Sequence, residues 1–128
     1  LLPMTDTGSQ LILVIDDEPV QLVIAKKLLE RLSYKVHCCA SGEAGLEFLN
    51  THHADLVILD IIMDPGIDGV TACEQLLETR PDQKVLFSTG FSDKATLTRA
   101  AELSKGKCLF KPYSLEQIGT MVQSRLRP

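Results

Sequence analysis

Short apolar runs alternate with amphipathic segments along nearly the whole chain. The runs are four to six residues long and rich in Val, Ile and Leu, which is typical of buried strands. The segments between them carry apolar residues at helical spacing, and Ser41, Ser92 and Ser114 stand where a helix N-cap is expected. The predicted strands cover residues 11–15, 34–39, 55–60, 84–89 and 107–110. The predicted helices cover residues 19–32, 41–50, 69–79, 92–103 and 114–126.

The uniformly apolar character of the strands predicts the fold class. Strands of this kind are buried on both faces, which indicates a parallel sheet covered by helices on either side. Right-handed crossovers then favour an α/β, doubly wound, flavodoxin-like sandwich whose five-stranded parallel sheet has the order 2-1-3-4-5. We expect residues 1–10 to form a linker or tail and residues 11–128 to form one domain. The functional crevice of such a fold lies outside the carboxyl ends of the strands.

Composition narrows the function classes. The chain has 128 residues, of which 45% are hydrophobic and 23% charged, as in an ordinary globular domain. Its net charge of −4 argues against a nucleic-acid-binding domain, and no apolar run is long enough to span a bilayer, so we expect no membrane contact by this segment. Cys38, Cys39, Cys73 and Cys108 lack the spacing of a zinc site, which indicates reduced thiols and a cytoplasmic location.

Polar residues that could act in catalysis or bind a metal follow the predicted strands. Asp16 and Asp17 follow the first strand, and Asp60 ends the third. Because these strands are neighbours in the predicted order, three carboxylates converge at one edge of the sheet, which is unfavourable unless a cation lies among them. Oxygen ligands without histidine or cysteine favour Mg²⁺ (or Mn²⁺). Thr89 and Lys111 end the fourth and fifth strands, and with the acids they form a set suited to phosphoryl transfer.

Each of these residues also has an ordinary structural explanation, but the set and its order are specific. The chain resembles the receiver domains of the two-component response-regulator family over residues 11 to about 127. The resemblance is carried by the acidic pair in "VIDDEP", by Asp60 after "LVIL", by Thr89-Gly90, and by Lys111-Pro112 in "LFKP".

The resemblance implies a role for each matching residue. Asp60 would be the phosphoacceptor, and Asp16, Asp17 and Asp60 would hold the metal together with the backbone carbonyl of Ile62. Thr89 and Lys111 would contact the phosphoryl group. The Lys111–Pro112 peptide bond would be cis, which would turn the lysine back into the site.

The resemblance also implies partners. A histidine kinase or a histidine phosphotransfer domain would donate the phosphoryl group, and a protein of unknown identity would read the output. The isolated domain would catalyse its own phosphorylation and dephosphorylation without being a conventional enzyme. "LLPMTD" resembles the junction before the receiver of a hybrid sensor histidine kinase, although an unrelated tail is an equal alternative.

The helix at 19–32 has more apolar residues than one buried face needs, so we expect Leu22 and Ile24 to face outward and contact the donor.

The chain departs from the family pattern in three places. The loop after Asp60 is one residue longer than the commonest form, with Asp64 as the extra residue. Cys108 stands where the family usually has an aromatic residue that moves on phosphorylation, so the switch would have to rely on other groups. Ile62 and Phe91 are apolar at positions near the phosphoryl group and cannot orient an attacking water, which predicts slow dephosphorylation.

Other classes remain as alternatives. A non-phosphorylated, receiver-like docking module is favoured by Cys108 but opposed by the complete Asp–Thr–Lys set. A phosphatase similar to the haloacid dehalogenases would need a second aspartate where Ile62 stands. A flavodoxin-like FMN carrier would need a phosphate-binding loop after the first strand, where "DDEP" would repel a phosphate.

Overall fold

A computed structural model describes residues 10–64, 66–90 and 93–127. The strands are β1 (Leu11–Ile15), β2 (Lys35–Cys39), β3 (Leu56–Asp60), β4 (Val85–Thr89) and β5 (Leu109–Phe110). The helices are α1 (Pro19–Arg31), α2 (Gly42–Thr51), α3 (Gly69–Thr79), α4 (Lys94–Ser104) and α5 (Leu115–Leu126). Apart from Gln10, the predicted linker at residues 1–10 lies outside the described residues.

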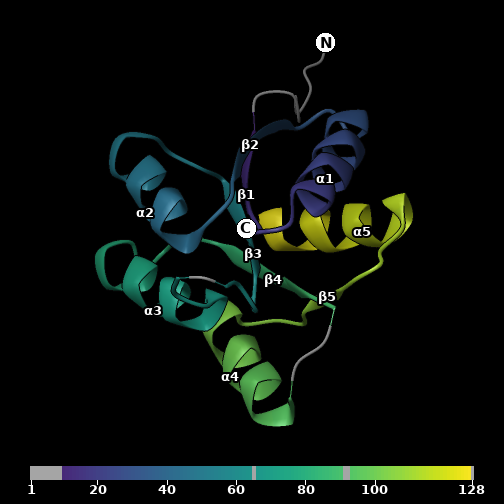
Figure 1. Cartoon of the computed structure of the whole chain (residues 1–128). Helices are drawn as coiled ribbons and strands as arrows, with labels where there is room; N and C mark the ends of the chain where they lie inside the picture. The colour runs from purple at the N-terminus through teal and green to yellow at the C-terminus, as the bar shows by residue number, and fades with distance from the viewer. Residues whose placement is uncertain (1–9, 65, 91–92, 128) are drawn as a thin grey trace.

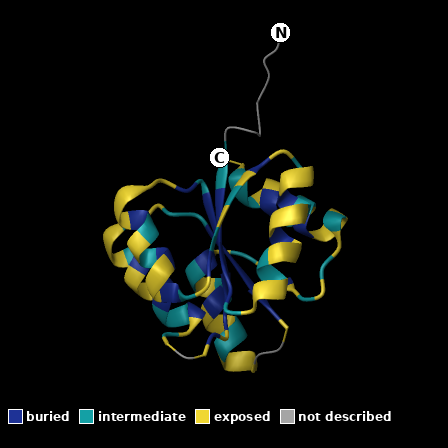
Figure 2. Ribbon diagram, turned by 45° about the horizontal axis from the view of Figure 1, so that its top comes forward, coloured by how far each residue is buried: buried dark blue, intermediate teal, exposed yellow. Residues whose placement is uncertain are grey.

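The five strands form one parallel sheet in the order β2-β1-β3-β4-β5, which confirms the predicted α/β fold (Figure 1). On one face, Leu29 of α1 and Ile118 of α5 belong to a single apolar cluster. On the other face, Leu49 of α2, Leu76 of α3 and Ala100 of α4 belong to a second cluster. The central strands β3 and β4 are buried at every residue, because helices cover them on both sides (Figure 2).

Every predicted boundary agrees with the structure to within two residues, and one predicted N-cap and one strand length differ for physical reasons. The Ser41 side chain accepts a hydrogen bond from the Ala44 N–H, and Ser114 forms a capping box, so both N-cap predictions are confirmed. The Ser92 prediction is wrong, because the Asp93 side chain caps α4 by accepting from the Thr96 N–H. The last strand is two residues long instead of four, since it pairs with β4 only at its end.

Helix α1 presents a different outer face from the predicted one. Leu22 is partly buried and packs on the core, because a spacing of three from the buried Ala25 places it on the inner face. The prediction that Leu22 faces outward is therefore wrong. Ile24 is 39% exposed as expected, and it is joined by Val20 at 68% and Val23 at 53%. These three residues form an apolar patch on α1, which we call the α1 patch.

Candidate functional site

Three carboxylates meet at the carboxyl ends of β1 and β3. Asp16 and Asp17 directly follow β1, Asp60 is the last residue of β3, and the two strands are paired neighbours. One carboxylate oxygen from each residue lies within 4.8 Å of the others. Asp16 and Asp60 are 3% and 4% exposed, so their charges are poorly solvated. The donor set consists of oxygens alone, which fits a hard divalent cation.

Asp60 has the environment of a strongly perturbed acid. Burial and the neighbouring charge of Asp16 raise its pKa from 3.8 to about 7, with Lys111 acting in the opposite direction. Its backbone is held against the start of α3, where the Gly69 N–H donates to the Ile61 carbonyl at 2.7 Å. A Cβ atom at Gly69 would lie 2.0 Å from the Asp60 carbonyl oxygen, so the close approach of helix and strand requires glycine.

Lys111 reaches the acids from β5. The Lys111–Pro112 peptide bond is cis, as the resemblance implied. The lysine Nζ lies 2.6 Å from Asp16 Oδ2, 3.5 Å from Asp60 Oδ2 and 4.0 Å from Glu18 Oε1. Burial by itself lowers the pKa of Lys111, but the hydrogen bond to Asp16 and the acidic charges outweigh it and leave the pKa raised. The ammonium is therefore held in its charged form among the carboxylates.

A small open cavity adjoins Asp60. Its walls are formed by Glu18, Asp60, Ile62, Thr89, Gly90 and Lys111. Thr89 is 1% exposed at the end of β4, and Ile62 is 52% exposed on the loop after β3. The structure thus brings together the six residues singled out from the sequence, from the ends of four strands and the loop between β3 and α3. Phe91 lies outside the described residues.

The fold and this constellation agree with one family. The family model of the response regulator receiver domain matches residues 12–123. The chain belongs to the response regulator receiver family. The resemblance inferred from "VIDDEP", Asp60, Thr89-Gly90 and "LFKP" is therefore confirmed.

The relatives that this chain matches include a sensor kinase and a transcriptional regulator. Sensor kinase CckA from Brucella abortus is 33% identical over 122 residues, which make up 94% of this chain and 13% of CckA. The alkaline phosphatase synthesis transcriptional regulatory protein PhoP from Bacillus subtilis is 30% identical over 116 residues, 91% of this chain and 48% of PhoP. The chain therefore spans less than half of either relative.

A solved structure supports the same fold. The response regulator TrrA from Thermotoga maritima, solved in complex with Mg²⁺-BeF, superposes with a TM-score of 0.81 and 27% identity. The match covers 92% of this chain and 99% of TrrA.

Within the part of this receiver that the structure describes, no helix is long and apolar enough to cross a membrane.

Sequence reasoning missed two residues near the acceptor of this receiver. Glu18 borders the cavity and lies near Lys111, although it follows the acidic pair directly and could have been included. Burial, and then the charges of Asp16 and Asp60, raise the pKa of Tyr113 to about 12. Its position after the cis peptide bond was a signal that could have been used.

The structure shows the surroundings of two residues that depart from the family pattern, Cys108 and Asp64. Cys108 is 8% exposed and belongs to the core cluster that includes Phe87, so its thiol is a packing group. Asp64 has an exposed side chain, and its backbone N–H donates to Asp17 Oδ2 at 3.1 Å. The loop after β3 thus contacts the acidic cluster through its main chain.

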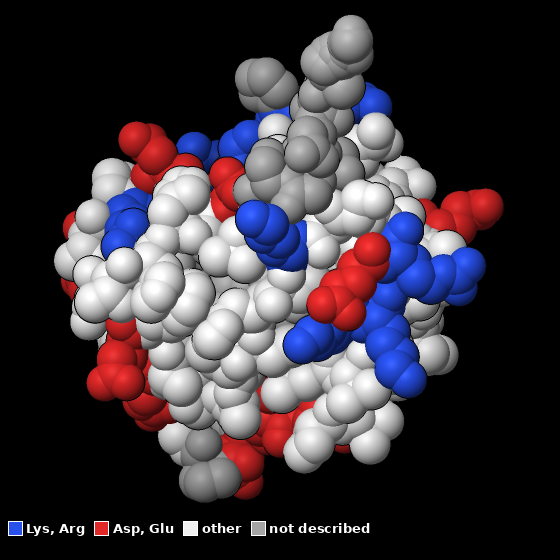
Figure 3. Space-filling model, turned by 90° about the horizontal axis from the view of Figure 1, so that it is seen from above, with Lys and Arg blue, Asp and Glu red and all other residues white. Residues whose placement is uncertain are grey.

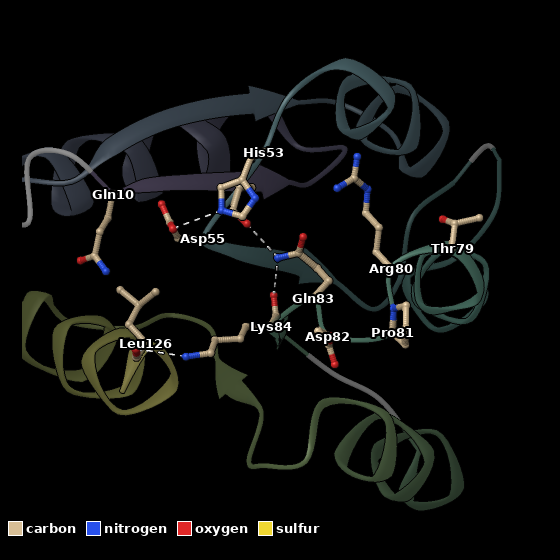
Figure 4. Close-up of a pocket in the computed structure, with 11 residues that line it drawn as sticks. Gln10, His53, Asp55, Thr79, Arg80, Pro81, Asp82, Gln83, Lys84 and Leu126 are labelled. Carbon is tan, nitrogen blue, oxygen red and sulfur yellow. Dashed lines mark hydrogen bonds and ion pairs between the residues drawn. The ribbon is translucent and has the colours of Figure 1, made fainter. Parts of the chain in front are cut away.

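A larger cavity of about 500 Å³ lies at the opposite end of the sheet, near the amino ends of β1, β3 and β4 (Figure 4). Two of its polar side chains form internal hydrogen bonds: Gln83 Nε2 donates to the Ala54 and Lys84 carbonyls, and Lys84 Nζ donates to the Leu126 carbonyl. Seen from above, the surface carries lysine and arginine side chains interspersed with acidic ones (Figure 3). The cavity lies where the starts of these strands meet the end of α5.

Proposed function

We propose that this receiver domain takes a phosphoryl group from a phosphohistidine onto Asp60. The observation that carries the proposal is the position of Asp60: a buried carboxylate, within 4.8 Å of two further carboxylates, with the Lys111 ammonium 3.5 Å away. In the transfer, an oxygen of the Asp60 carboxylate attacks the phosphorus. The phosphorus–nitrogen bond of the donor breaks, and its electron pair stays on the imidazole nitrogen.

The other residues have supporting roles in this proposal. Lys111 would form an ion pair with an oxygen of the phosphoryl group, and the Thr89 hydroxyl would donate a hydrogen bond to another. Both side chains border the cavity beside Asp60: Thr89 ends the buried strand β4, and Lys111 directly follows β5. Such rigid elements hold the groups in position before the donor arrives.

The acidic cluster fits Mg²⁺, or Mn²⁺ in its place. Asp16, Asp17 and Asp60 would hold the ion together with the Ile62 backbone carbonyl. When bound, the ion neutralises negative charge on the carboxylates and on the phosphoryl oxygens. Burial first, and then the charges of Asp16 and Asp17, raise the pKa of Asp60, which supports this assignment because a cation among the carboxylates would offset both effects.

The α1 patch is the surface that we propose for the donor, a histidine kinase or a histidine phosphotransfer domain. Val20, Val23 and Ile24 lie on the first two turns of α1, and α1 begins three residues after Asp16. Exposed apolar side chains beside a reactive site favour docking of an apolar helix face.

We also propose a cytoplasmic location, since the four cysteines are free thiols.

The phosphoacceptor assignment is tested by intact-protein mass spectrometry with acetyl phosphate and Mg²⁺. We expect one acid-stable, hydroxylamine-labile phosphoryl adduct on the wild-type protein and none on Asp60→Asn. Asp64→Asn is the matched control, because Asp64 is an exposed aspartate on the adjoining loop. If a folded wild-type protein forms no adduct, the proposal is wrong and a non-phosphorylated docking module becomes the better explanation.

The donor surface is tested by replacing Val20 and Val23 with serine. We expect transfer from a cognate phosphohistidine protein to slow at least about tenfold, because each exposed valine contributes roughly 1 kcal/mol of apolar contact. The rate with acetyl phosphate should stay unchanged, since this donor does not need the α1 patch. An equal loss with both donors would argue against a docking role.

A further inference from the structure

We propose that Glu43 is a positioning residue that fastens the loop between β3 and α3 and thereby prepares the acidic cluster for its cation. This inference rests on the proposed function, because it concerns the same metal site. Glu43 lies in the first turn of α2 and is exposed, and nothing in its sequence context points to the site.

The contact between Glu43 and the loop is specific. Glu43 Oε2 accepts a hydrogen bond from the Ile67 backbone N–H at 3.2 Å. Gly66 has a φ of +110°, and a Cβ atom there would lie 3.0 Å from Glu43 Oε1. A Cβ atom at Gly42 would lie 3.0 Å from Ile67 Cγ1, so the loop rests directly on the first turn of α2.

The same loop is attached at its other end to the acidic cluster. The Asp64 N–H donates to Asp17 Oδ2 at 3.1 Å, which orients one of the three carboxylates. Ile62, whose carbonyl is the fourth proposed ligand, lies between Asp60 and this contact. The loop therefore joins the metal ligands to α2, with Asp17 at one attachment and Glu43 at the other.

The attachment at Glu43 has a thermodynamic consequence. A loop without it would sample more conformations, and binding of a cation would have to order them. Without this acceptor the Ile67 N–H would form its hydrogen bond with water, which does not restrain the loop. We therefore expect the loss of this single acceptor to weaken Mg²⁺ binding by about fivefold.

Glu43 could instead act only through its negative charge, and three variants separate the two effects. Glu43→Ala removes both the charge and the acceptor. Glu43→Gln removes the charge but keeps a side-chain oxygen that can accept from the Ile67 N–H. Glu47→Gln removes a charge from an exposed residue one turn further along α2, and serves as the matched control.

Two measurements are made on each protein: hydrogen exchange of the Ile67 amide in EDTA, and the Mg²⁺ dissociation constant by calorimetry. We expect Glu43→Ala to speed Ile67 exchange about tenfold and to weaken Mg²⁺ binding about fivefold. Glu43→Gln and Glu47→Gln should stay within about twofold of wild type in both measurements, because exposed charges are screened.

The outcomes distinguish this inference from the proposed function. A wild-type protein that binds no Mg²⁺ would overturn the proposed metal site. A wild-type protein that binds Mg²⁺ while Glu43→Ala has the same dissociation constant would overturn the role of Glu43 alone. Equal weakening by Glu43→Ala, Glu43→Gln and Glu47→Gln would also overturn it, since charge would then be the cause.

Discussion

The ammonium of Lys111 lies closer to Asp16 than to Asp60, at 2.6 Å from Asp16 Oδ2 and 3.5 Å from Asp60 Oδ2. The lysine thus neutralises a proposed metal ligand at the same time as it faces the proposed acceptor. A divalent cation that enters the cluster competes with the ammonium for the same carboxylate. Metal binding and the position of Lys111 are therefore coupled through Asp16.

This coupling predicts opposite effects of Lys111→Met on two measurements. Mg²⁺ should bind several-fold more tightly, on the order of threefold, because a competing positive charge has been removed. Phosphorylation by acetyl phosphate should slow at least about tenfold, because the transferred group loses a charge-assisted contact. Calorimetry and mass spectrometry measure the two effects. Lys107→Met, at an exposed lysine on the approach to β5, should change neither, and weaker Mg²⁺ binding by Lys111→Met would contradict the coupling.

The raised pKa of Asp60 predicts how stability depends on pH in EDTA. Between its ordinary value of 3.8 and about 7, the folded protein binds a proton that the unfolded chain releases, so the free energy of unfolding falls as pH rises through this range. Asp60→Asn lacks this proton and should be more stable than wild type at pH 8, by on the order of 2 kcal/mol. The difference should vanish near pH 4. Urea denaturation at both pH values measures it.

Asp64→Asn is the control for this experiment, because Asp64 is exposed. It should alter stability equally little at both pH values. Addition of Mg²⁺ should remove most of the advantage of Asp60→Asn at pH 8, since the cation stabilises the ionised carboxylates. A pH-independent difference between Asp60→Asn and wild type would contradict the raised pKa.

The close approach at Gly69 predicts a steric effect on the acceptor strand. In Gly69→Ala, the new methyl group would lie 2.0 Å from the Asp60 carbonyl oxygen, which belongs to the backbone and cannot rotate away. We expect a loss of about 1–3 kcal/mol in the free energy of unfolding, measured by urea denaturation. Gly106→Ala is the control, because its Cβ would lie 3.6 Å from the flexible Arg125 side chain. Equal effects of the two changes would show that the contact at Gly69 relaxes easily.

The exposed Ile62 side chain beside Asp60 predicts a slow loss of the phosphoryl group. Ile62→Asn places a polar group at the border of the cavity, where it can orient a water molecule for attack on the acyl phosphate. We expect dephosphorylation to become at least about threefold faster, measured by the decay of the adduct in mass spectrometry. Ile24→Asn, at an exposed isoleucine on α1, should leave the decay unchanged. An unchanged or slower decay in Ile62→Asn would count against a shielding role.

Local patterns in the sequence were enough to predict the elements but not all of their details. Helix α3 has the predicted bounds because a strong turn precedes it and apolar spacing continues through it. Ser92 and Asp93 are both good N-cap residues, and only the backbone path into α4 selects Asp93. Leu22 was assigned to the wrong face of α1, because the inner face of a helix depends on which strands it covers.

The sequence by itself determined the strand–helix alternation and the parallel sheet, because these depend on periodicity. It also determined the candidate site residues, because residue types at strand ends single them out: Asp16, Asp17, Asp60, Thr89 and Lys111. Only the tertiary structure decided that Lys111 lies nearest to Asp16, that Gly69 touches the Asp60 backbone and that Glu43 holds Ile67. Such contacts join residues far apart in the chain. Their distances follow from how helices and loops pack, which no local pattern encodes.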